Sequence, residues 1–160
     1  MLLTSGLLAT GSLAIGFLAI ALSVLLVSAG YFDLRYRRIP NGLSLSVLLV
    51  SLTKLALVSS FASATITLLL TALLLMIGVA VFALGWLGAG DVKLIVALSL
   101  GFSPEQLVDF VVAFNLLGGV LAVSVLVYNG YARRQQLRVI NTLPYGVAIA
   151  SAGLLLMACG

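Results

Sequence analysis

Six long stretches of almost purely apolar residues dominate this sequence and limit how it can fold. They lie near residues 5–31, 42–59, 63–87, 92–102, 106–128 and 142–159. Most are about twenty residues long, the length of helix that crosses a bilayer. Helices also satisfy their own backbone groups in lipid, and the short polar–apolar alternation of a membrane barrel is missing. We therefore predict an all-α, polytopic membrane protein with about six transmembrane helices, forming a single domain over residues 1–160.

The fourth stretch, 92–102, is too short to cross by length alone, because its helix would rise only about 16 Å. Cytoplasmic loops carry an excess of Lys and Arg, so the positions of these residues test whether the fourth stretch crosses the membrane. With six crossings, seven basic residues share the cytoplasmic side: Arg35, Arg37, Arg38, Lys93, Arg133, Arg134 and Arg138. Without the fourth crossing, Arg133, Arg134 and Arg138 would lie on the extracytoplasmic side, against this rule. The charges thus favour six crossings with both termini extracytoplasmic. Either the short helix gains length from residues 85–90, or the protein is thin at this point.

Composition excludes several kinds of site. The chain has no histidine and one cysteine, Cys159. An internal disulfide, a Cys/His zinc site and a Cys–His nucleophile are therefore excluded, and we expect neither a metal nor another cofactor. The net charge of +4 comes from a few loop residues that set topology, so we expect membrane lipid rather than nucleic acid as a partner. No Lys or Arg precedes Arg35, which favours a retained first helix over a cleaved signal peptide.

Asp33 is the first of two aspartates placed where apolar stretches end or begin, in a chain with only four acidic residues. An ionisable group at the edge of the hydrocarbon is expensive and therefore a candidate functional group. Pro40 disfavours helix at the residue before it, and Asn41 is a good helix cap. Residues 33–41 are therefore expected to form a tight basic hairpin. The alternative role for Asp33 is an interfacial ion pair with a nearby arginine.

Asp91 is the second, within Gly88-Ala89-Gly90-Asp91-Val92-Lys93. Glycines permit backbone conformations and close approaches that other residues forbid. The alternative interpretation is a flexible hinge with Asp91 as an ordinary helix N-cap. Lys93 is expected either to orient the aspartates or the substrate carbonyl, or to act only as a topology charge.

Taken together, the two aspartates suggest paired-carboxylate chemistry at the cytoplasmic face. When two carboxyl groups are held close, like charge raises one pKa, so that one acts as acid and the other as base. Such a pair activates water for attack on a peptide carbonyl, without a metal or a covalent intermediate.

Three segments resemble those of a known family. They are the Asp33-to-Asn41 hairpin sequence, the Gly88-to-Lys93 sequence and Leu143-Pro144-Tyr145-Gly146. Together they resemble the type IV prepilin peptidases, which are intramembrane aspartyl proteases of the GxGD kind. The resemblance implies a catalytic pair of Asp33 and Asp91, with Gly88, Gly90, Lys93, Pro40 and Asn41 supporting the site and residues 143–146 helping to line it.

The resemblance further implies cleavage of short basic leaders from prepilins or pseudopilins, just before the apolar N-terminal helix of the pilin. It places this cleavage at the cytoplasmic face of a bacterial or archaeal cytoplasmic membrane. The chain lacks the Cys-x-x-Cys pairs of longer members and is similar to the compact branch that serves Flp-type pili, so we expect no methyltransferase activity. Two alternatives are a cation- or proton-coupled transporter and a non-catalytic pilus-assembly scaffold. We also expect Asn115 to hydrogen bond between helices, with a role in the site as the alternative. Gly118 and Gly119 are expected to permit close helix contact.

Overall fold

The computed structural model describes residues 2–140 and 143–159, and the side chains from residue 13 onward. The described residues form six α-helices: α1 (Leu2–Tyr36), α2 (Asn41–Val58), α3 (Phe61–Ala83), α4 (Ala89–Ser99), α5 (Pro104–Arg134) and α6 (Tyr145–Cys159). Four of them, counting α1 from Leu13, are long and apolar enough to cross a membrane. The prediction of an all-α polytopic membrane protein is confirmed, and α4 is short, as expected, with 11 residues.

The predicted hairpin over residues 33–41 is wrong in its first part, because α1 continues through Asp33 to Tyr36. The helix ends where Arg37 adopts a left-handed conformation (φ 53°) and donates its backbone N–H to the carbonyl of Asp33, at 3.0 Å. This bond satisfies a carbonyl that the helix end would otherwise leave without a partner. The prediction that Asn41 caps α2 is also wrong: Pro40 occupies the cap position and Asn41 is the first helical residue.

A glycine turn connects α3 to α4. Gly85 has φ +76°, and its N–H bonds to the carbonyl of Phe82, while the N–H of Trp86 reaches back to Val81. This pair of bonds is the Schellman arrangement that commonly ends helices at glycine. Residues 85–88 therefore form the turn, and α4 gains only residues 89–91 from the glycine-rich stretch. The helix also ends at Ser99, three residues before the end of the predicted stretch, so with 11 residues it is no longer than that stretch and the expected lengthening is wrong.

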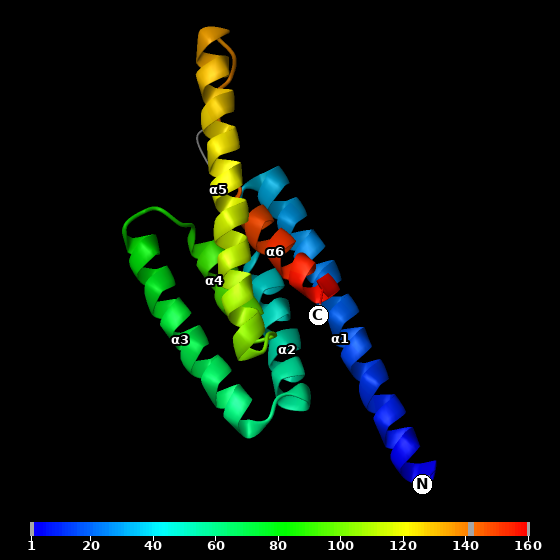
Figure 1. Cartoon of the computed structure of the whole chain (residues 1–160). Helices are drawn as coiled ribbons and strands as arrows, with labels where there is room; N and C mark the ends of the chain where they lie inside the picture. Colours follow the sequence, from blue (N-terminus) through cyan, green and yellow to red (C-terminus); the bar gives the residue numbers. More distant parts are fainter. Residues whose placement is uncertain (1, 141–142, 160) are drawn as a thin grey trace.

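The short helix α4 lies at the centre of the bundle, packed against α2, α3 and α6 (Figure 1). Its buried apolar residues are Val92, Leu94, Ile95, Ala97 and Leu98. Buried polar contacts hold it to α3, because the hydroxyls of Thr71 and Ser99 are hydrogen bonded at 2.9 Å. Such bonds between helices suit a lipid environment, where water does not compete for the polar groups.

Three chain segments that carry the resemblance meet at one end of the bundle. Figure 1 shows the C-terminal end of α1, the α3–α4 turn and the start of α6 at this end, while the α2–α3 and α4–α5 connections lie at the opposite end. Helix α5 extends beyond the first end and carries Arg133 and Arg134 in its last turn. The fold therefore brings Asp33 and Asp91 to the same end of the molecule.

Candidate active site

Asp33 lies near the C-terminal end of α1, and its carboxyl group sits against the first turn of α6. Its side chain is only 6% exposed, and the backbone N–H groups of Gly146 and Val147 donate to its carboxylate. First-turn N–H groups have no partner within their own helix, and the helix dipole favours negative charge there. One carboxylate oxygen, Oδ2, is buried and accepts no hydrogen bond from the described residues. That oxygen can carry a proton without losing a hydrogen bond from the described residues.

Gly146 is the reason that the carboxyl group of Asp33 reaches these amides. A Cβ atom at position 146 would lie 2.9 Å from each of Cβ, Cγ and Oδ2 of Asp33. Carbon atoms in contact prefer a separation of about 3.5–4.0 Å, so any side chain here would push α6 away from α1. The absence of a side chain at Gly146 therefore brings α6 and Asp33 together.

Asp91 is the third residue of α4, not its N-cap, which is Gly88. Its side chain folds back and accepts a hydrogen bond from the backbone N–H of Gly88. An acidic or amide side chain at this position commonly reaches back to the cap in this way. A Cβ atom at position 88 would lie 2.9 Å from Oδ2 of Asp91. Gly88 therefore leaves room for the carboxylate to turn toward the end of the helix.

Both aspartates line one cavity of about 410 Å³. The other lining residues come from the α1–α2 loop, the α3–α4 turn, the residues just before α6 and the first residue of α6. They are Arg37, Gly85, Trp86, Leu87, Gly88, Leu143 and Tyr145. Asp91 precedes the apolar stretch 92–102. Burial raises its pKa to about 6, the negative charge of Asp33 adds to this increase, and the hydrogen bond from Gly88 opposes it. A carboxyl group with a pKa close to neutral can both give and take a proton.

The remaining predicted site residues join the two aspartate segments and do not line this cavity. Lys93 Nζ donates to Asn41 Oδ1 at 3.0 Å, which links the start of α4 to the start of α2. Gly90 lies against Ile39, since a Cβ atom at position 90 would be 3.4 Å from the Ile39 Cβ atom. Pro40 is the cap residue of α2 in the same loop. These contacts fix the position of α4, and therefore of Asp91, relative to the loop that follows α1.

Sequence reasoning missed two features of the site. Trp86 was not among the predicted site residues, yet it lines the aspartate cavity. The close approach of Gly146 to Asp33 was also not anticipated, although residues 143–146 had been singled out. The expected close helix contact is confirmed at Gly118, where a Cβ atom would lie 2.9 Å from the Tyr145 ring, and is wrong for Gly119, which has no such neighbour within 4 Å.

The chain was compared with known proteins. The profile of the type IV leader peptidase family matches residues 19–127, a range that contains both Asp33 and Asp91. No curated protein and no solved structure matches the chain. Because the family profile covers more than half of the sequence, the chain belongs to the type IV leader peptidase family, and with its long apolar helices it is a multi-pass membrane peptidase.

Proposed function

We propose that this protein is an intramembrane aspartyl endopeptidase that removes the basic leader from type IV prepilins of the Flp-like class. The observation that carries the proposal is the shared cavity of Asp33 and Asp91, two carboxyl groups from helices far apart in the sequence. Family membership supports prepilins as the substrates. Family membership does not favour the transporter alternative. Neither does the position of the aspartates, since Asp33 lies near the end of α1, Asp91 at the start of α4, and both line one cavity.

The proposed reaction uses one proton shared by the two carboxyl groups. The ionised carboxylate takes a proton from a water molecule while the water oxygen bonds to the scissile carbonyl carbon. The protonated carboxyl group gives its proton to the carbonyl oxygen, which produces a neutral tetrahedral intermediate. Collapse of the intermediate breaks the C–N bond. The leaving nitrogen receives a proton from the pair, and one hydroxyl of the intermediate returns a proton to the pair as the new carboxyl group forms, so that the pair again shares one proton. One water is consumed, and the products are a leader with a free carboxylate and a pilin with a free amine.

Charge supports a cytoplasmic location for this end of the molecule. The loop after α1 carries Arg37 and Arg38, and the last turn of α5 carries Arg133 and Arg134. Basic residues concentrate in cytoplasmic loops, so six crossings would place the aspartates at the inner face of a cytoplasmic membrane. A basic prepilin leader is retained on that side for the same reason.

Single substitutions test the proposal. Asp33→Asn and Asp91→Asn each remove one ionisable group while keeping its shape, and each should abolish processing of a co-expressed prepilin, seen as loss of its gel shift. Asp109→Asn is a matched control, because Asp109 is an exposed acidic residue on α5 that does not line the cavity. Membrane fractionation checks that all three variants insert. Continued cleavage by either active-site variant would reject the proposal.

A further inference from the structure

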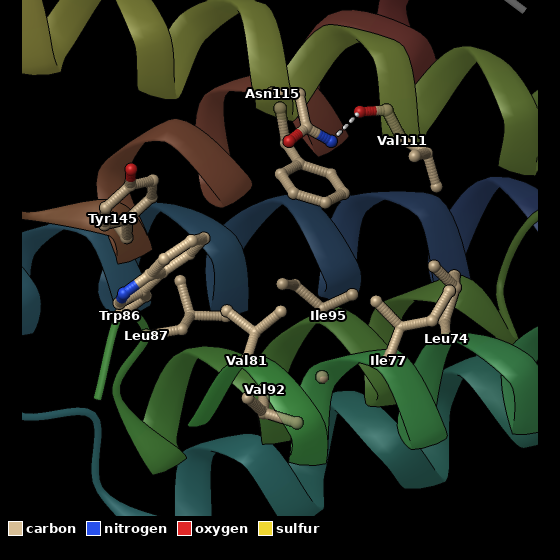
Figure 2. Close-up of a pocket in the computed structure, with 12 residues that line it drawn as sticks. Leu74, Ile77, Val81, Trp86, Leu87, Val92, Ile95, Val111, Asn115 and Tyr145 are labelled. Carbon is tan, nitrogen blue, oxygen red and sulfur yellow. Dashed lines mark hydrogen bonds between the residues drawn. The ribbon is translucent and has the colours of Figure 1, made fainter. Parts of the chain in front are cut away.

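A second cavity, of about 370 Å³, lies directly beside the aspartate cavity, between α3, α4 and α5 (Figure 2). Trp86, Leu87 and Tyr145 line both cavities, so the two share part of their walls. Most of the remaining wall is apolar, formed by Leu74, Ile77, Val81, Val92, Ile95, Val111 and Phe114. Pockets for ligands range from roughly 300 to 1,000 Å³, so this cavity suits one or two side chains and not a whole helix.

The second cavity extends away from the aspartates into the bundle. Leu74 lies nine residues before Ala83, the last residue of α3 (83 − 74 = 9). Nine residues of helix rise about 14 Å, which leads from the end of the bundle toward its middle. A substrate that enters the aspartate cavity from the cytoplasmic end would therefore place the residues nearer the bilayer centre in the apolar cavity.

Asn115 places a polar group in this apolar wall. Its Nδ2 donates to the backbone oxygen of Val111 at 2.7 Å, within α5 (Figure 2). The predicted bond between helices is therefore wrong for this residue. A carboxamide has two N–H donors and an oxygen acceptor. Among the described residues nothing else is hydrogen bonded to this side chain, so one N–H and Oδ1 are available to a ligand.

Cleavage of a membrane helix requires hydrogen-bonding groups such as the carboxamide of Asn115. A peptide bond inside a helix is shielded, so the segment around it must unwind before water attacks. Unwinding frees backbone N–H and C=O groups, and each is expensive in an apolar environment unless it is hydrogen bonded. The free donor and acceptor of Asn115 match one backbone N–H and one C=O of an extended strand.

We propose that the α3–α5 cavity is the subsite for the first apolar residues that follow the scissile bond, and that Asn115 positions their unwound backbone. This inference rests on the proposed function, in which the segment after the bond is apolar and the leader before it is basic. The apolar walls match the first of these segments only.

A photocrosslinking experiment tests the location without requiring cleavage. The probe is a synthetic peptide with a Lys-rich leader and an apolar helix, carrying a benzophenone side chain at the first residue after the junction. It is incorporated into vesicles with the Asp91→Asn variant. Crosslinks should map to α3 and α5 around the cavity. Ile77→Trp, which fills the cavity, should lower their yield about tenfold, whereas Leu73→Trp, an exposed position on α3 outside the cavity wall, should not.

Kinetics test the role of Asn115. Asn115→Leu should lower kcat/KM for a prepilin about tenfold or more, because a freed backbone group is left without a partner. Asn115→Gln should restore part of the loss. Ser124→Ala is the matched control, since Ser124 is exposed on α5 and bonds only to its own helix, at Val120. A purely structural role for Asn115 would lower thermal stability together with activity, and that result would overturn the assignment.

The outcomes separate the two proposals. Crosslinks that map elsewhere, are absent or are unchanged by Ile77→Trp overturn the subsite, even if cleavage depends on both aspartates. Crosslinks in the cavity, combined with a wild-type protein that does not cleave, reject the proposed function and leave the binding site standing.

Discussion

The substitution Gly146→Ala tests the geometry of the site most directly, because it adds one methyl group between α6 and Asp33. The added carbon would lie 2.9 Å from the Cβ atom of Asp33. Contact at about 3.5 Å requires a separation of at least about 0.6 Å more. Rotation about χ1 moves the carboxyl group of Asp33 but not its Cβ atom, so rotation alone cannot relieve this contact. The backbones of α1 and α6 must move apart.

This displacement should impair catalysis more than folding. Moving α6 also weakens the hydrogen bonds from the Gly146 and Val147 amides to Asp33. Misplacement of a reacting group by about 1 Å can lower a rate about 100-fold, and we expect a decrease in kcat of that order. Alanine is a better helix former than glycine, so α6 itself should not be destabilised.

The assay compares kcat and KM for a purified prepilin in proteoliposomes, with thermal unfolding followed by circular dichroism. Gly119→Ala is the matched control, because a Cβ atom at that position meets nothing within 4 Å. The control should retain wild-type kinetics. If Gly146→Ala cleaved at a rate within about twofold of the control, close contact between α6 and Asp33 would not matter for catalysis, and our account of the site would be refuted.

Three further predictions concern the other half of the site. Because the pKa of Asp91 is raised from 3.8 to about 6, its contribution to the stability of the protein should be greatest at low pH and decrease as the pH rises through about 6. The value of kcat/KM should also fall above that pH. A flat pH–rate profile would contradict proton donation by Asp91. Gly88→Ala should reduce kcat at least about tenfold by crowding the Asp91 carboxylate, whereas Gly42→Ala, which adds a methyl group in open space, should be silent in the same assay. Lys93→Met should remove the hydrogen bond to Asn41 and lower the free energy of unfolding by about 1 kcal/mol or less, with a smaller effect on kcat. A complete loss of cleavage would instead show a direct catalytic role for Lys93.

Several features were predictable because their causes are local in the sequence. The length and continuity of the apolar stretches predict helices in a membrane, and five of the six stretches need no information about their neighbours. The rarity of acidic residues in such a chain draws attention to Asp33 and Asp91. Their catalytic roles remain predictions, but their presence in one cavity follows from the fold.

Helix ends and hydrogen-bond partners were the least predictable features. Asp33 was expected in a loop, but α1 ends three residues later, at Tyr36, and Arg37 then adopts the left-handed conformation. Asn41 was expected to cap α2 and instead accepts a bond from Lys93. Asn115 was expected to bond to another helix and bonds to its own. In each case several partners were chemically acceptable, and the choice depended on which groups the tertiary structure brought within reach.

The sequence by itself determined that this chain is a membrane protein of apolar helices with two conspicuous aspartates, because transfer of apolar side chains into lipid depends on composition along each segment. Only the tertiary structure decided that the amides of α6 hold Asp33, that Gly146 permits this contact, and that an apolar cavity adjoins the aspartates. These features arise where helices distant in the sequence pack together. Packing at that scale depends on the shapes of all the contacting side chains at once, which no single segment contains.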